Sequence, residues 1–157
     1  MKVFYGGSFC PPTLGHEDII RRAANLFDEV VVAVMVNPAK QYAISMEERV
    51  SLLQTLFQDV SNVRVIADDG LLVDAARREG ADALLRGIRG VSDLPFEMQL
   101  AEANRRLSGL ETLYLQTLPE YSLLCSSVVL DVARHGGSVD GMVPALIKSE
   151  ILRALAR

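Results

Sequence analysis

Two hydrophobic patterns alternate along the whole chain, and this alternation constrains the fold more than any other feature. Short apolar or β-branched runs, typical of buried strands, occur at residues 3–5, 30–36, 63–66, 83–85 and 112–115. Between them apolar residues recur with helical spacing, as in the stripe formed by Ile19, Ile20, Ala23, Ala24 and Phe27. Strands that alternate with helices predict an α/β fold, a Rossmann-like, doubly wound, five-stranded parallel sheet with helices on both faces.

Local signals set the ends of several helices. Ser45 and Glu48 form a capping box that predicts a helix start, because each side chain satisfies an unpaired amide of the first turn. Gly80 is expected to end a helix over about 71–79 in the left-handed conformation. Further helices are expected over 93–107 with Pro95 in the first turn, from Ser126 to Gly136-Gly137, and after Pro144.

Composition narrows the class of protein. The 157 residues (17.2 kDa) suit one domain spanning 1–157, and 50% hydrophobic residues can form a packed core. A net charge of −4 argues against nucleic acid as a partner. The longest apolar run, 30–36, is too short to span a membrane. Two cysteines cannot build a disulfide framework, so we expect a soluble protein in the reducing cytoplasm.

A sheet of this kind binds ligands at the carboxyl ends of its strands, which here are the loops 6–16, 37–45, 67–71, 86–93 and 116–126. The first loop is rich in glycine and ends at His16, where a helix begins. His16 precedes Ile19 and Ile20 by three and four residues, so it shares their face and is expected to point at a bound ligand. The alternative is a histidine that only caps or packs.

The loops also contain motifs. Thr13-Leu14-Gly15-His16 resembles the (H/T)-x-G-H signature of the nucleotidyltransferase superfamily. Over nearly its whole length the chain resembles the bacterial phosphopantetheine adenylyltransferases within it. The matching segments are Tyr5-x-Gly-Ser-Phe9, Asn37-Pro-x-Lys40, Glu47-Glu-Arg-Val50, Leu84-x-Arg-Gly-x-Arg89, Ser92-Asp93, Phe96-Glu97, Asn104-Arg105, Pro119-Glu-Tyr-Ser122 and Ser126-Ser127.

The resemblance implies an activity. It implies transfer of AMP from ATP to 4′-phosphopantetheine, which gives dephospho-coenzyme A and pyrophosphate by direct in-line attack without a covalent enzyme intermediate. Mg²⁺ is expected to arrive with ATP, since this ion normally accompanies nucleotide phosphates. The resemblance also implies a homohexamer.

The same resemblance assigns roles to individual residues. Catalytic roles fall on His16 for transition-state stabilisation, on Lys40 for holding the acceptor phosphate, and on Arg89 for the ATP phosphates. The acceptor is expected to contact Ser8, Lys40, Leu72 and Arg86. ATP is expected to contact Ser8, Phe9, His16, Gly87, Ile88, Arg89, Glu97, Tyr121, Ser122, Leu123, Leu124, Cys125, Ser126 and Ser127.

Each of these residues also has a purely structural interpretation. Lys40 suits a solvated surface charge, and Leu72 suits the core. Arg86 or Arg89 suits an ion pair with an acid at 93 or 97. The Glu97 carboxylate, expected to accept from the ribose hydroxyls, equally suits the first turn of a helix. Capping explains one of the serines at 126 and 127.

Two positions depart from the family pattern. Cys10 stands where the family has Asp, and Cys125 stands where it has the first of three serines. Both thiols suit small buried apolar side chains. A sharper hypothesis places them near one another at the nucleotide site, where they would make activity sensitive to oxidation. A zinc site formed with His16 and His135 matches no zinc-finger spacing.

Two other functions remain open. A nicotinate mononucleotide adenylyltransferase would also suit Gly6-Gly-Ser-Phe9 and Pro11-Pro12, although Arg86-Gly-x-Arg89 and Pro119-Glu-Tyr-Ser122 argue against it. A nucleotide-binding regulator that has lost catalysis is suggested by Cys10. The enzyme hypothesis requires that His16 and Arg89 face the same pocket.

Overall fold

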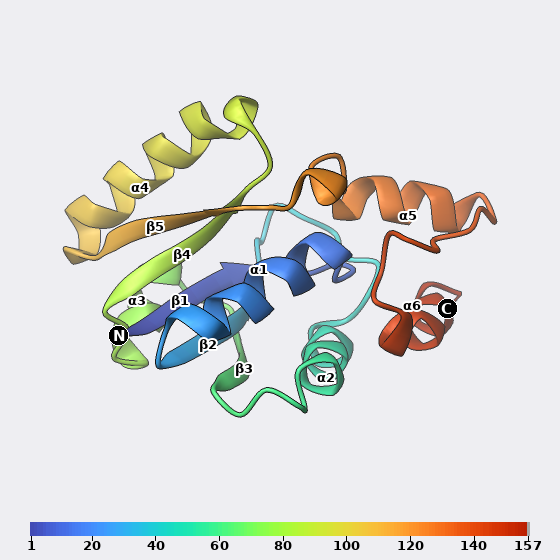
Figure 1. Cartoon of the computed structure of the whole chain (residues 1–157), viewed down its shortest axis with the longest axis horizontal. Helices are drawn as coiled ribbons and strands as arrows, with labels where there is room; N and C mark the ends of the chain where they lie inside the picture. The colour runs from blue at the N-terminus through green and yellow to red at the C-terminus, as the bar shows by residue number, and fades with distance from the viewer. Residues whose placement is uncertain (157) are drawn as a thin grey trace.

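The computed structural model describes residues 1–156, and its centre is a five-stranded sheet in which all strands are parallel (Figure 1). The strand order is β3-β2-β1-β4-β5. The bounds are β1 Lys2–Gly7, β2 Glu29–Met35, β3 Val63–Asp68, β4 Ala83–Ile88 and β5 Glu111–Gln116. The chain therefore winds outward in one direction from β1 and then in the other from β4. This confirms the doubly wound sheet, whose ligand position is the point of reversal between β1 and β4.

Helices connect the strands and cover the sheet. Their bounds are α1 Leu14–Leu26, α2 Met46–Leu56, α3 Leu72–Arg78, α4 Leu94–Ser108, α5 Ser126–Arg134 and α6 Lys148–Leu155. Short 3₁₀ turns at Val91–Asp93, Pro119–Tyr121 and Ala145–Ile147 lead into α4, into the loop before α5, and into α6. In Figure 1, α5 and α6 lie together at one end of the molecule, beyond the sheet.

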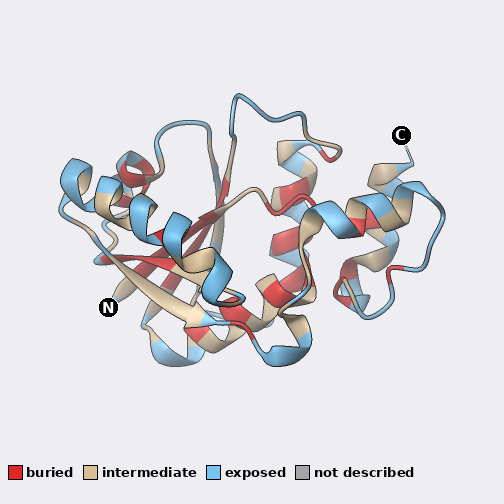
Figure 2. Cartoon of the chain, turned by 90° about the horizontal axis from the view of Figure 1, so that it is seen from above, coloured by how far each residue is buried: buried red, intermediate tan, exposed pale blue. Residues whose placement is uncertain are grey.

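The central strands β1 and β2 are buried on both faces, as their continuous apolar runs predict, whereas the edge strands β3 and β5 are only partly buried. On one face Val30, Val32 and Val34 of β2 pack with residues of α1, α2, α5 and α6. On the other face Val31 and Ala33 pack with α3. Figure 2 shows that buried residues gather in the central strands and on the helix faces turned toward them.

The predicted helix ends are confirmed at several points. The Ser45 side chain accepts from the Glu48 amide, and the Glu48 side chain accepts from the Ser45 amide, as a capping box does. Gly80 follows α3 with φ +66°, a conformation that costs glycine little. The structure differs at 93–107 because a 3₁₀ turn comes first, and the segment after Pro144 also begins as 3₁₀ before α6 starts at Lys148.

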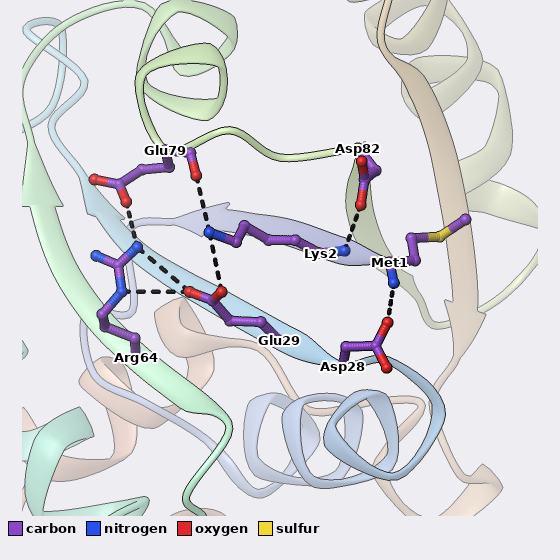
Figure 3. Close-up of polar contacts among 7 residues, drawn as sticks. All are labelled: Met1, Lys2, Asp28, Glu29, Arg64, Glu79 and Asp82. Atoms are coloured by element: carbon purple, nitrogen blue, oxygen red, sulfur yellow. Dashed lines mark hydrogen bonds and ion pairs between the residues drawn. The ribbon is translucent and has the colours of Figure 1, made fainter.

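Charged side chains meet at the amino edge of the sheet (Figure 3). The Lys2 ammonium lies 2.9 Å from a Glu29 carboxylate oxygen and 3.1 Å from the Glu79 carbonyl oxygen. Arg64 pairs with the carboxylates of both Glu29 and Glu79. This edge cluster, defined by Lys2, Glu29, Arg64 and Glu79, satisfies its charges internally.

The structure was also searched for membrane-spanning helices. None of the helices within residues 1–156 combines the length and the apolar character that crossing a bilayer requires.

Candidate active site

A cavity of about 780 Å³ opens at the carboxyl edge of the sheet, a volume in the range of small-molecule sites. It is bordered by the loops that follow β1, β2, β4 and β5 and by the start of α3. Most of the sequence-predicted residues line it: Ser8, Phe9, His16, Lys40, Leu72, Arg86, Gly87, Arg89, Glu97, Tyr121, Leu124, Cys125 and Ser126.

Four predicted residues do not border this cavity: Ile88, Ser122, Leu123 and Ser127. Ser122 and Leu123 follow the 3₁₀ turn over 119–121, and Leu123 is 89% exposed to solvent. The Ser122 hydroxyl donates to the Pro119 carbonyl at 2.7 Å, and the Ser127 hydroxyl lies 3.1 Å from the Cys125 sulfur. Their predicted contact with ATP therefore stays a prediction.

His16 is held at the first turn of α1. Its Nδ1 accepts a hydrogen bond from the Thr13 backbone N–H at 3.0 Å and lies 3.1 Å from the Thr13 hydroxyl. The Thr13 side chain in turn accepts from the His16 amide, so the pair forms a capping box with histidine in the position of the usual Glu or Gln. The Phe9 ring packs edge-on against the imidazole, with centroids 5.0 Å apart. The capping interpretation is therefore correct, and it orients the ring within the cavity.

This geometry settles which nitrogen of His16 carries the proton. A backbone N–H only donates, so Nδ1 must be unprotonated and the neutral ring carries its hydrogen on Nε2. Burial, reinforced by the nearby charges of Arg89 and Arg86, lowers the pKa of His16 to about 4. At neutral pH the residue is thus a neutral donor from Nε2.

Arg86 stands near the end of β4, at the point of reversal. Its Nε and Nη2 donate to the two carboxylate oxygens of Glu97 at 2.8 and 2.7 Å, and its Nη1 donates to the Gly6 carbonyl at 3.2 Å. Glu97 is only 8% exposed, and its hydrogen bonds raise the pKa of the Arg86 guanidinium. The ion-pair interpretation is therefore correct, and the pair also lines the cavity.

Arg89 makes a second ion pair. Its Nε and Nη2 donate to Asp93 at 3.2 and 3.1 Å, and its backbone N–H donates to the same carboxylate at 2.9 Å. Hydrogen bonding to Asp93 raises the pKa of Arg89. Arg89 and His16 line one cavity, so the condition set by the sequence for an enzyme is met.

Lys40 lies in the exposed turn after β2 and also borders the cavity. Its ammonium has no acidic partner among residues 1–156, unlike the two arginines. The charged residues lining the cavity are the cations Lys40, Arg86 and Arg89 and the carboxylates Asp93 and Glu97. An excess of positive charge therefore collects here in a chain whose net charge is −4.

Two helix starts meet beside these cations. Thr13, Gly15 and His16 at the start of α1, and Cys125 and Ser126 at the start of α5, line the cavity. The Ser126 hydroxyl donates to the Pro11 carbonyl at 2.8 Å, which fixes the two starts against one another. The amino-terminal end of a helix favours an anion, although at α1 the Leu14 amide already donates to the Met142 carbonyl and the His16 amide to the Thr13 hydroxyl.

Leu72, the first residue of α3, packs against β1 where that strand ends. A methyl group added to Gly6 would lie 2.6 Å from a Leu72 terminal carbon, so the Leu72 side chain would have to shift to accept it. Leu72 also packs against the second core cluster, as its core interpretation expects, while it lines the cavity.

The two cysteines occupy different environments. Cys10 is buried in the main core and does not border the cavity, which fits its interpretation as a small apolar residue. Cys125 does border it, and the Ser127 hydroxyl lowers the pKa of its thiol. Within residues 1–156 no group of three or more His, Cys, Asp or Glu is placed to hold a metal ion.

Sequence reasoning missed two residues beside the cavity. The (H/T)-x-G-H motif gives Thr13 no role of its own, although its spacing of three residues before His16 is the spacing of a capping box. Arg49 belongs to a segment that matches the family, and the match gives it no role. It shares its helix face with Leu52, Leu53 and Leu56, and a charge on an apolar stripe could have drawn attention to it.

Comparisons with known proteins identify the family of this chain. Residues 4–130 match the family model described as cytidylyltransferase-like. The chain is 47% identical to the phosphopantetheine adenylyltransferase of Synechococcus sp. (strain WH7803) over 98% of this chain and 93% of that one. It is 44% identical to the one of Caldanaerobacter subterraneus subsp. tengcongensis over 94% and 93%. The chain belongs to the phosphopantetheine adenylyltransferase family.

A solved structure gives the same fold at greater distance. It is described as a putative nicotinate-nucleotide adenylyltransferase from Vibrio parahaemolyticus, with a TM-score of 0.67 and 17% identity over 99% of this chain and 96% of that one. At that identity the match shows the shared fold alone. Membership of the phosphopantetheine adenylyltransferase family makes the chain a nucleotidyltransferase.

Proposed function

We propose that this protein transfers AMP from ATP to 4′-phosphopantetheine, giving dephospho-coenzyme A and pyrophosphate in coenzyme A biosynthesis, reversibly and in the cytoplasm. One observation supports the proposal above the others. Around a single cavity, a neutral imidazole that donates from Nε2 stands with three cations, Lys40, Arg86 and Arg89. Phosphoryl-type transfer needs this combination of positioning and positive charge, and it needs no nucleophile from the protein.

The reaction balances without a covalent intermediate. An oxygen of the acceptor phosphate attacks the α-phosphorus of ATP, the bond from that phosphorus to the bridging oxygen breaks, and pyrophosphate leaves with the electron pair. His16 Nε2–H donates to an α-phosphate oxygen as negative charge builds there, which lowers the barrier without any proton transfer.

The three cations bind phosphate groups of the two different substrates. Lys40, which has no acid partner among the described residues 1–156, holds the acceptor phosphate against the α-phosphate, and Arg86 binds the same acceptor. Arg89 neutralises the β- and γ-phosphates that become pyrophosphate. The carboxylates of Glu97 and Asp93 hold the two guanidinium planes in place before substrate arrives, which limits the entropy lost on binding.

The nucleotide substrate is MgATP. The two carboxylates that line the cavity are both hydrogen bonded to arginines, so the phosphates and water are the ligands left for the ion. The remaining predicted nucleotide contacts, from Ser8 and Phe9 to Tyr121, Leu124 and Ser126, surround the same cavity.

The test is to measure pyrophosphate release with ATP and each of two acceptors, 4′-phosphopantetheine and nicotinate mononucleotide. We expect turnover with the first at least ~10²-fold faster than with the second, because a site built to bind one polar acceptor rejects another strongly. Faster turnover with nicotinate mononucleotide would assign the protein to the rival activity. Binding of ATP with no turnover would indicate a regulator that has lost catalysis.

The proposal includes a homohexamer. It is supported by α4, in which Glu97 is the only buried residue while Phe96 and Met98 are each 63% exposed. Light scattering should give a particle of six times the 17.2 kDa chain mass, and a particle of one chain mass would contradict this part of the proposal.

A further inference from the structure

Arg49 of α2 is a buried charge that the proposed mechanism does not use. The residue is 1% exposed, and among residues 1–156 no carboxylate lies within ion-pair distance of it. Burying a guanidinium without an acid partner is costly, and its other interactions must offset that cost. Where those interactions lie shows what the residue does.

The guanidinium joins two of the loops that border the cavity. Nη1 donates to the Ser8 carbonyl at 2.7 Å, in the loop after β1. Nε donates at 3.2 Å to the carbonyl of Ser45, the N-cap of the same helix, which also accepts the Arg49 backbone N–H. Its central carbon lies 4.2 Å from the centroid of the Tyr42 ring, which fits a cation–π contact. One side chain thus spans the neighbouring loops of β1 and β2.

Tyr42 extends this connection to Lys40. Its hydroxyl accepts the Asn37 backbone N–H at 2.6 Å. The turn is closed by the Lys40 N–H, which donates to the Asn37 carbonyl, and by the Ala39 N–H, which donates to the Asn37 side chain, both at 2.9 Å. The path from Arg49 through Tyr42 and Asn37 to Lys40 consists entirely of direct contacts.

Arg49 also acts on the peptide that borders the cavity. The peptide group whose carbonyl belongs to Ser8 carries the N–H of Phe9, and both residues line the cavity. A cation bound to that carbonyl polarises the group, and polarisation along a chain makes its N–H a stronger donor. An anion that accepts from the Phe9 N–H would therefore gain from Arg49, although the Arg49 side chain does not border the cavity.

We propose that Arg49 is a positioning residue of the phosphate site, which fixes the Lys40 turn against the Ser8 loop and strengthens anion binding there. This inference takes the identity of the acceptor from the proposed function. The claim that Arg49 strengthens phosphate binding does not depend on that function.

Three variants test the connection. Arg49→Lys keeps the charge but loses the flat face over Tyr42 and one of the two carbonyl contacts. Tyr42→Phe keeps the ring under Arg49 and removes only the hydroxyl that holds Asn37. Arg21→Lys is the matched control, because Arg21 also lies over an aromatic ring, Phe57, at 5.5 Å, and donates to the Leu56 carbonyl, but it has acid partners and does not border the cavity.

We expect Arg49→Lys to raise KM for 4′-phosphopantetheine about tenfold and Tyr42→Phe to raise it about threefold, the range for losing one or two hydrogen bonds. The variant with both substitutions should have a KM for 4′-phosphopantetheine within about twofold of that of Arg49→Lys alone, because both substitutions remove contacts of the same path. Arg21→Lys should leave KM unchanged. Calorimetry with inorganic pyrophosphate should show weaker binding by Arg49→Lys and unchanged binding by Tyr42→Phe.

Several outcomes overturn the inference. A lowered thermal midpoint for Arg49→Lys with unchanged KM and pyrophosphate affinity would mean that Arg49 only stabilises the fold. If Arg49→Lys does not fold, Tyr42→Phe decides, and an unchanged KM there overturns the path to Lys40.

Other results would refute the proposed function without refuting the role of Arg49. Wild-type protein that binds pyrophosphate but turns over no acceptor would refute the adenylyl transfer, while weaker pyrophosphate binding by Arg49→Lys would still support the role of Arg49. Wild-type protein that binds no pyrophosphate would refute both.

Discussion

The two edges of the sheet both gather charged side chains, and they use them differently. At the amino edge, Lys2, Glu29, Arg64 and Glu79 satisfy one another (Figure 3). At the carboxyl edge, Arg86 and Arg89 are also paired, but Lys40 and the Nε2–H of His16 find no partner among residues 1–156. A cluster of charges therefore does not by itself identify the site. The site is marked by polar groups that are held in place and still have a hydrogen bond or ion pair to offer a ligand. Four experiments test this contrast between the two edges.

The largest effect is expected from His16→Ala. Loss of the Nε2 donor should cut kcat at least ~10²-fold, the scale for one aligned donor to a developing charge. ATP affinity, measured by calorimetry, should remain largely intact because Arg89 still binds the phosphates. Turnover close to wild type would remove His16 from the mechanism.

Two further variants separate catalysis from capping. His16→Gln keeps an acceptor for the Thr13 amide, so it should recover thermal stability relative to His16→Ala while kcat stays low. His135→Ala, at an exposed histidine outside the cavity, should change neither quantity.

The next effect is expected from Lys40→Ala. The substitution should raise KM for 4′-phosphopantetheine about tenfold and change KM for ATP much less, because the ammonium is assigned to the acceptor phosphate. Steady-state kinetics with each substrate varied in turn measures both constants. Lys148→Ala, whose ammonium pairs with Asp140, is the matched control. Equal losses for both substrates would show that Lys40 has been assigned to the wrong substrate.

A smaller effect concerns pH. The folded-state pKa of His16 is about 4, below its ordinary value of about 6.5, so between these values the unfolded chain binds the proton that the folded chain refuses. The stability that His16 contributes is present above pH ~6.5 and is lost as the pH falls toward 4. Thermal midpoints of wild type should therefore fall more steeply over this range than those of His16→Gln, and parallel curves would contradict the shifted pKa.

The smallest effect is expected at the opposite edge. Arg64→Ala breaks two partly exposed ion pairs, whose contribution to the free energy of unfolding is about 0–1 kcal/mol. The thermal midpoint should drop by a few degrees at most, and kcat and both KM values should be unchanged. A loss of activity would show that the two edges of the sheet are coupled.

The sequence predicts the elements and their order well, because alternating apolar patterns and glycine or capping signals are local. The buried run of β2, the capping box at Ser45 and the stop at Gly80 all read directly from neighbouring residues. The resemblance to the family also places most site residues around one cavity, since parallel strands end at the same edge.

What the sequence could not predict depends on contacts between distant segments. Arg49 is buried because the Ser8 carbonyl and the Tyr42 ring come from other loops to meet it, beside the Ser45 carbonyl at the start of its own helix. Leu123 lies two residues after a 3₁₀ turn and is exposed, and no apolar periodicity in the sequence predicts that exposure. Cys10 turns into the core although its loop borders the cavity, so the paired-thiol hypothesis loses one of its two members from the site.

The hydrogen bond from the Thr13 amide to His16 has a consequence for inhibitor design. Because the backbone allows only one tautomer of the neutral ring, compounds that offer this imidazole a lone pair should be favoured. Compounds that present an N–H or O–H there would meet another hydrogen, and chemical libraries for this pocket can be filtered by that rule before any synthesis.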